Sequence, residues 1–205
     1  MKYLLLILVS LSGISGMAQP GYNIAVSIKP FKNQFVYLGY HYGKLKALQD
    51  SVKLDANSKG NFKGKTALAG GIYFVVSPRK EILFELLIDK QQHFSVIADS
   101  ANLPSSVVFT GSPDNLLFQS YSTYINTNGA TISKLTDEIK AAEPGKDTAA
   151  IMTKLRTLSN QVQQYRENVE KKNPASILTM IFRSMKEPIV PPANRQPGGK
   201  YDSVF

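Results

Sequence analysis

The sequence contains no cysteine, and this absence excludes several kinds of chemistry. Without a thiol, the chain cannot form disulfides, carry out thiol–disulfide exchange or hold a metal ion through thiolate ligands. Its stability must therefore come from packing and hydrogen bonding. Because no cysteine follows the apolar run near the start of the chain, we also expect no lipid anchor there.

Recognisable catalytic and metal-binding motifs are scarce as well. The two histidines, His41 and His93, lie far apart in the sequence, whereas a zinc site needs three or four ligands. Residues 55–60 begin like a calcium loop, but Lys59 occupies the fifth position, so we predict a hairpin turn. There is no Gly-x-Ser-x-Gly motif. We therefore predict no catalytic, cofactor-binding or metal-ligating residues, and a chain that is not an enzyme.

Acidic residues are outnumbered by basic ones, 15 against 24, and the formal net charge is +9. In the first half of the chain the lysines are spread among expected strands: Lys44, Lys46, Lys53, Lys59, Lys63 and Lys65. Nucleic-acid binding requires a concentrated basic surface and a reading motif, so we expect no nucleic-acid partner. Beyond the N-terminal run, no segment reaches the roughly 18 apolar residues of a transmembrane helix, so we expect no membrane span.

The first eighteen residues have the three-part layout of a secretory signal peptide. Lys2 supplies a positive start, residues 3–9 are apolar, and Gly16-Met17-Ala18 offers small residues at a cleavage site. We predict cleavage after Ala18, a mature terminus at Gln19 and export, most simply to the periplasm. The alternative is a buried N-terminal strand or helix.

Residues 19–111 form the first predicted domain, which is β-rich. Short segments with alternating or continuous apolar side chains recur at roughly 8–12 residue spacing, with turn residues between them. They comprise residues 22–28, 35–40, 51–54, 61–63, 71–76, 82–88, 93–97 and 107–109. This spacing predicts an antiparallel β-sandwich or a barrel-like sheet.

Residues 112–187 form a helical region, which makes the predicted fold class α+β. Ser112 and Pro113 are suited to the N-cap and first position of a helix, and Asn128-Gly129 is expected to interrupt it. After a turn at residues 143–146, Asp147 is expected to cap a second helix. A third helix is expected from Asn173-Pro174 to the residue before Pro188.

The second helix carries a narrow apolar stripe at heptad spacing, formed by Ile151, Leu155, Leu158, Val162, Tyr165 and Val169. We predict that it packs on the preceding helix through Ile132, Leu135 and Ile139, as an antiparallel hairpin within the chain. The alternative is a coiled coil between two chains.

The final segment, residues 188–205, is rich in proline and glycine and is typical of a linker. Only six residues follow its last glycine, so we expect the natural protein to continue beyond Phe205.

A candidate ligand-binding surface is formed by Tyr40, Tyr42 and His41, whose rings could provide a stacking platform for a sugar or peptide. The alternative is that these rings pack against the core or across strands. Glu81 and Glu85 are interpreted as solvent-facing strand charges.

The β-rich domain resembles a domain of unknown function that precedes the redox domain in many exported, TlpA-like thiol-disulfide reductases of the thioredoxin superfamily. The similarity is carried by Val36-Tyr37-Leu38, Asp50-Ser51-Val52-Lys53-Leu54, Gly60-Asn61-Phe62-Lys63-Gly64, Gly71-Ile72-Tyr73, and Gly111-Ser112 with Asn115. The helical region is similar to a second segment of such proteins, through Asn173-Pro174-Ala175-Ser176-Ile177-Leu178 and Met185-Lys186-Glu187-Pro188-Ile189-Val190-Pro191.

The resemblance implies a non-catalytic accessory or interaction module whose redox domain, with its Cys-x-x-Cys pair, is absent from this chain. It implies a protein partner or a C-terminal thioredoxin-like domain, and no cofactor of the chain's own. The alternative hypothesis is a free-standing periplasmic binding protein for a glycan or peptide.

Overall fold

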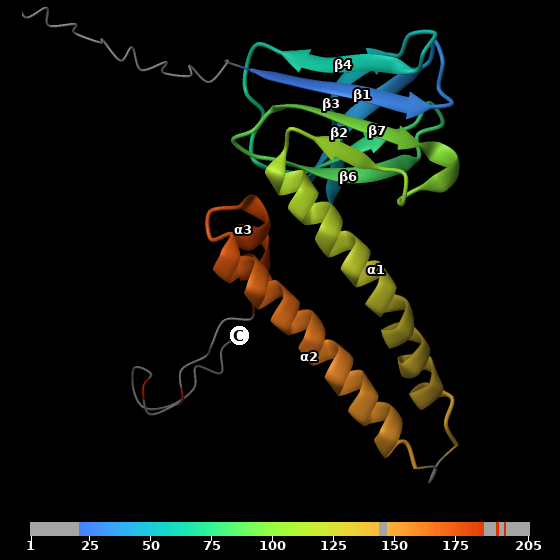
Figure 1. Ribbon diagram of the computed structural model, residues 1–205, viewed down its shortest axis with the longest axis vertical. Helices are drawn as coiled ribbons and strands as arrows, with labels where there is room; N and C mark the ends of the chain where they lie inside the picture. Colours follow the sequence, from blue (N-terminus) through green and yellow to red (C-terminus); the bar gives the residue numbers. More distant parts are fainter. Residues whose placement is uncertain (1–20, 144–146, 187–191, 193–194, 196–205) are drawn as a thin grey trace, which may run out of the picture.

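The structure, a computed structural model, describes residues 21–143 and 147–186, together with residues 192 and 195. Within these residues, eight strands precede three α-helices, and a short 3₁₀ helix, η1 (Ser100–Asn102), precedes the last strand (Figure 1). The strands are β1 (Tyr22–Lys29), β2 (Phe35–Tyr42), β3 (Leu45–Lys53), β4 (Lys59–Gly64), β5 (Gly71–Val76), β6 (Ile82–Ile88), β7 (His93–Asp99) and β8 (Val108–Thr110). The helices are α1 (Pro113–Lys140), α2 (Ala149–Lys172) and α3 (Ile177–Ser184). This order confirms the predicted α+β fold.

The strands form two four-stranded sheets, in the orders β4-β1-β7-β8 and β3-β2-β5-β6. Every neighbouring pair is antiparallel except β1 and β7, which run parallel. The predicted sandwich is therefore confirmed, but it is not wholly antiparallel. The chain alternates between the sheets: β2 and β3 belong to the second sheet, β4 pairs with one side of β1, and β5 and β6 complete the second sheet. Strand β7 then pairs with the other side of β1, in the parallel direction.

The core lies between the two sheets. Strand β1 alternates between buried and half-buried residues, with Ile24 and Ile28 at 1% and 0% exposure. They join Val36, Leu38 and Leu86 of the other sheet, each 0% exposed, in one apolar cluster. Burying one such side chain contributes about 1.5–3 kcal/mol to stability, so this cluster accounts for the cohesion of the sandwich.

Strand β3 is longer than the sequence indicates, because it begins at Leu45 rather than at residue 51. Tyr42 pairs with Leu45 across a two-residue turn in which Gly43 has a positive φ of 58°. Most of β3 is exposed, as expected for an edge strand, and its mixed lysine and leucine residues hide the usual alternation.

The turn after β3 uses Asp55 as a local hydrogen-bond acceptor. Its Oδ1 accepts from the amides of Asn57 and Lys59, at 2.8 and 2.9 Å. Ser58 has a positive φ of 62°, and β4 starts immediately afterwards. The predicted hairpin turn at residues 55–60 is therefore present.

Helix α1 starts as predicted but does not break where a break is predicted. The Ser112 hydroxyl caps the helix by accepting from the Asn115 amide, and Pro113 is its first residue. The helix then continues through Asn128-Gly129 for 28 residues. The Asn128 side chain donates to the Tyr124 carbonyl one turn earlier, and the Gly129 penalty of roughly 1 kcal/mol is too small to stop a helix that packs on α2.

Helices α1 and α2 form the predicted antiparallel hairpin, which extends away from the sheets as an arm (Figure 1). Val169 is buried and the rest of the predicted stripe on α2 is half-buried, whereas the other faces are mostly exposed. On α1, Leu135 is buried at 6% exposure, between half-buried Ile132 and Ile139. Asp147 Oδ1 accepts from the Ala149 amide at 2.9 Å, although the helix boundary places Thr148 at the cap.

Helix α3 and the ends of α1 and α2 nearest the sheets pack on the outer face of the second sheet. Ser176 caps α3, which starts later than the expected Asn173-Pro174. Leu178 and Phe182, at 1% and 2% exposure, cluster with Leu87 of β6. This second apolar cluster attaches the helical region to the sandwich.

Two predicted segments, the signal peptide at residues 1–18 and most of the linker at residues 188–205, lie outside the described residues. In the part of the chain that is described, none of the helices combines the length and apolar character needed to cross a membrane.

Candidate functional site

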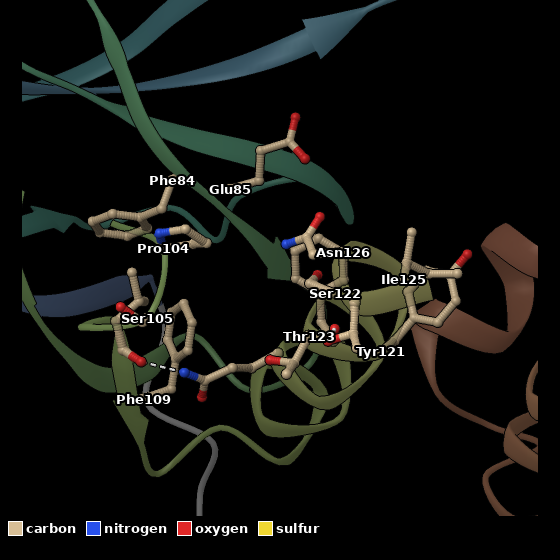
Figure 2. Close-up of a pocket in the computed structure, with 14 residues that line it drawn as sticks. Phe84, Glu85, Pro104, Ser105, Phe109, Tyr121, Ser122, Thr123, Ile125 and Asn126 are labelled. Carbon is tan, nitrogen blue, oxygen red and sulfur yellow. Dashed lines mark hydrogen bonds between the residues drawn. The ribbon is translucent and has the colours of Figure 1, made fainter. Parts of the chain in front are cut away.

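The open side of the sandwich between edge strands β6 and β8 carries a groove that α1 covers in part (Figure 2). Its volume is about 470 Å³, within the range of roughly 300–1,000 Å³ that is common for ligand sites. It is lined by Phe84, Glu85, Pro104, Ser105, Val107, Phe109, Phe118, Gln119, Tyr121, Ser122, Thr123, Ile125, Asn126 and Thr127.

The floor of the groove is apolar. Phe84 of β6 and Phe109 of β8 meet edge to face, with ring centroids 6.3 Å apart and an interplanar angle of 82°. Both rings belong to the sandwich core, with 7% and 4% exposure. Val107 and, from α1, Phe118 and Ile125 also line the groove. The groove therefore borders side chains of the sandwich core at the side that only α1 covers.

The first two turns of α1 bond directly to the strand edges that flank the groove. Asn115, fully buried, accepts from the Leu87 amide and donates to the Leu87 carbonyl, both at 2.8 Å. Gln119 donates to the Val107 carbonyl, just before β8. Ser112 accepts a third hydrogen bond from Asn115, at 2.8 Å. Asn115 therefore bonds to the backbone of edge strand β6, and Gln119 bonds to the backbone just before edge strand β8. At these positions the two side chains take the place of a neighbouring strand.

Glu85 is the only charged residue among the described residues that line the groove. Its Oε1 lies 3.2 Å from Nε2 of His41, and the two side chains are 46% and 32% exposed. The His41 ring also meets the edge of Phe74, 4.9 Å away. This exposed pair lies on the outer face of the second sheet and places a carboxylate at the rim of the groove. The protein as a whole is basic, with a formal net charge of +9.

The other polar groups of the groove are hydroxyls, amides and one phenol. Tyr121 accepts from Nε of Arg166 at 2.9 Å, which ties α1 to α2 behind the groove. Ser122, Thr123 and Asn126 come from α1 and face the sheet residues (Figure 2). These groups can donate and accept hydrogen bonds, and Glu85 adds one charge. The arrangement is suited to binding.

The predicted ligand-binding residues Tyr40, His41 and Tyr42 do not share one face of β2. Tyr40 packs toward the core against Tyr73, with centroids 5.9 Å apart, whereas His41 projects to the opposite face against Phe74. Tyr42 is 73% exposed. All three nevertheless border a second hollow of about 480 Å³, formed with residues 66–73. Burial raises the pKa of Tyr73 in this hollow.

The two histidines occur in different sheets, His41 on β2 and His93 on β7. Within residues 21–143 and 147–186, no group of three or more His, Cys, Asp or Glu side chains is arranged to hold a metal ion.

The groove was not predicted from the sequence, although the sequence contains one signal for it. Asn115, Gln119, Ser122 and Asn126 recur at spacings of 4, 3 and 4, which places these polar residues on one face of a helix. Glu85 is 46% exposed, as predicted for a solvent-facing charge, and it also borders the groove. No pattern along the chain could indicate that edge strands β6 and β8 border the same groove, because they belong to different sheets.

No family model matches the chain, and none of the curated proteins matches it either. Among solved structures, it is similar to (S)-allantoin synthase, at 10% identity and a TM-score of 0.32, over 46% of this chain and 45% of that one.

Proposed function

We propose that this chain is a non-catalytic interaction module, and that the groove between β6, β8 and α1 holds a polypeptide. The observation that supports this role is an apolar floor bordered by hydrogen-bonding side chains and one carboxylate, Glu85. A largely apolar pocket with a few convergent polar groups is the usual form of a binding site. Thiol chemistry is excluded because the sequence has no cysteine.

We further propose that the module serves an exported, TlpA-like thiol-disulfide reductase. The resemblance in motif order supports this context, in which a thioredoxin-like domain provides the Cys-x-x-Cys pair. The module's contribution is then to hold a substrate protein near that domain. Such an effect lowers the KM for protein substrates and leaves the chemistry of small disulfides unchanged.

A fusion of this chain to the N-terminus of a TlpA-like redox domain tests the proposal. We expect a lower KM for a protein with scrambled disulfides than the redox domain alone has, and an unchanged kcat for a small disulfide. Ile125→Asp, which places a charge in the groove, should restore the higher KM. Met152→Asp, at a position 53% exposed on α2 and outside the groove, is the matched control.

An unchanged KM in the fusion would contradict the proposed role. Reduction of insulin by the chain alone would also contradict it, because no thiol is available to form the mixed disulfide.

Export is part of the same proposal. The charged, apolar and small-residue regions at the start of the sequence support removal of residues 1–18. Mass spectrometry of the protein from its native envelope should find Gln19 at the N-terminus. Recovery of the uncleaved chain from the cytoplasm would exclude this route.

A second candidate is a free-standing binding protein for a glycan, and the hollow beside Tyr40 and Tyr42 favours it. The Tyr42 ring is 73% exposed, as a stacking surface for a sugar requires. Calorimetric titration with a panel of oligosaccharides tests this candidate. Tyr42→Ala should abolish binding, whereas Phe35→Ala, at an exposed position outside the hollow, should not.

A further inference from the structure

The edge of β6 is only partly closed by α1. Leu87 turns its amide and carbonyl away from β5, toward Asn115. Glu85 lies two positions earlier and pairs with Phe74 in the same ladder, in which Leu87 pairs with Ile72. Because bonding directions repeat every second residue in an antiparallel pair, the amide and carbonyl of Glu85 also face the open edge. No hydrogen bond joins these two groups to another described residue.

The polar face of α1 continues along this open edge. Asn115 and Gln119 already bond to strand backbone, as an added strand would. Ser122 and Asn126 follow at helical spacing, line the groove, and make no hydrogen bond to another described side chain. Figure 2 shows both on the α1 side of the groove, facing the residues of the sheets. They offer an amide and a hydroxyl where backbone of a ligand would pass.

The two faces of β6 differ in a way that defines the ligand. Phe84 points into the apolar floor, and Glu85 points to the outer face beside His41. Side chains of an added strand alternate with the same period of two. One set would therefore contact Phe84 and Phe109, and the other would lie beside the Glu85 carboxylate, where a basic residue forms a favourable cross-strand pair.

We propose that the groove binds an extended peptide segment with alternating apolar and basic side chains, which adds to the edge of β6 and bonds to the backbone of Glu85. This inference rests on the proposed role of the groove as a polypeptide-binding site and specifies how that site recognises its ligand. Recognition of a sheet edge reads the backbone, so it suits a module that accepts many protein segments. The single carboxylate on the rim accounts for the preference for basic residues.

Backbone methylation of a defined peptide tests the mode of binding. The probe is an acetylated and amidated hexapeptide of alternating valine and lysine, titrated into the ¹⁵N-labelled full chain and followed by NMR. We expect shifts of the Glu85 backbone amide and the Asn126 side-chain amide. Methylating the peptide nitrogens of one alternating set should weaken binding at least tenfold. Methylating the other set should not, because those groups point away from β6.

A variant separates the charge from the backbone contact. Glu85→Gln keeps the strand edge but removes the carboxylate, so it should weaken binding of the valine–lysine peptide several-fold. The same variant should bind a valine–threonine peptide as the parent protein does. Loss of binding of both peptides would indicate a damaged site. The Leu87 and Asn115 resonances report whether the edge of β6 is intact.

Three results would overturn the inference: equal binding of all methylated peptides, shifts centred on β3 or Tyr42, or groove resonances that no peptide moves. In the first case the groove recognises only the side chains of the peptide, and the proposed role of the chain as an interaction module is unaffected. The effect of Ile125→Asp on the KM of the fusion tests that broader role separately.

Discussion

The bonds between Asn115 and Leu87 are expected to be decisive for attaching α1 to the sandwich, and Asn115→Asp tests them with almost no change of shape. The aspartate still accepts from the Leu87 amide but cannot donate to the Leu87 carbonyl. Leu87 is 1% exposed and Asn115 fully buried, so water cannot replace the lost partner. An unsatisfied buried carbonyl costs about 1–3 kcal/mol, and the buried charge adds to this. We expect a total loss of about 3–5 kcal/mol at neutral pH.

The loss should depend on pH in a direction that follows from the geometry. Burial beside a carbonyl favours the neutral acid, so the pKa of the new carboxyl should rise above its unfolded value near 4. The protonated form can donate to the Leu87 carbonyl while it still accepts from the amide. The penalty is therefore full above the folded-state pKa and disappears as the pH falls toward the unfolded value.

Urea denaturation, followed by circular dichroism near pH 7 and near pH 4.5, measures both effects. Asn126→Asp is the matched control, because Asn126 is exposed on the same helix face and should cost less than about 0.5 kcal/mol. A loss below about 1 kcal/mol at Asn115, or one that is equal at both pH values, would refute the reasoning.

Three further predictions concern the helical arm and the sandwich. Gly129→Ala should raise the free energy of unfolding by about 0.5–1 kcal/mol in denaturant titrations, because an added Cβ meets nothing within 4 Å and the helix is continuous there. Leu158→Asp should melt the arm and spare the sheets in circular dichroism, at a cost of about 1–3 kcal/mol because Leu158 is half-buried; a concentration-dependent loss of helix would instead indicate contact between chains. Burial and the hydrogen bond to Asp50 raise the pKa of Tyr22 to about 12. Stability from the neutral phenol should therefore be lost between pH 10 and 12, in a step that Tyr22→Phe lacks.

Local sequence patterns determined most of the secondary structure. Alternation located β1, because a strand with one buried face must alternate. Continuous apolar runs located β5 and β6, most of whose residues are buried. Ser112-Pro113 located the start of α1, since the cap satisfies a helix amide that has no other partner. The stripe on α2 predicted the hairpin, because an apolar stripe that narrow needs a facing helix. Prediction failed where packing overrode local preference, as at Gly129 inside α1.

Only the tertiary structure decided how distant segments meet. The parallel pairing of β1 with β7 joins strands about 70 residues apart, and no periodicity along the chain specifies a neighbour. The same holds for the groove, where β6, β8 and α1 converge. A sequence records which face of each element is apolar, and that is enough to predict a core. It does not record which edges remain open once the core has formed, and in this protein those edges are where the candidate site lies.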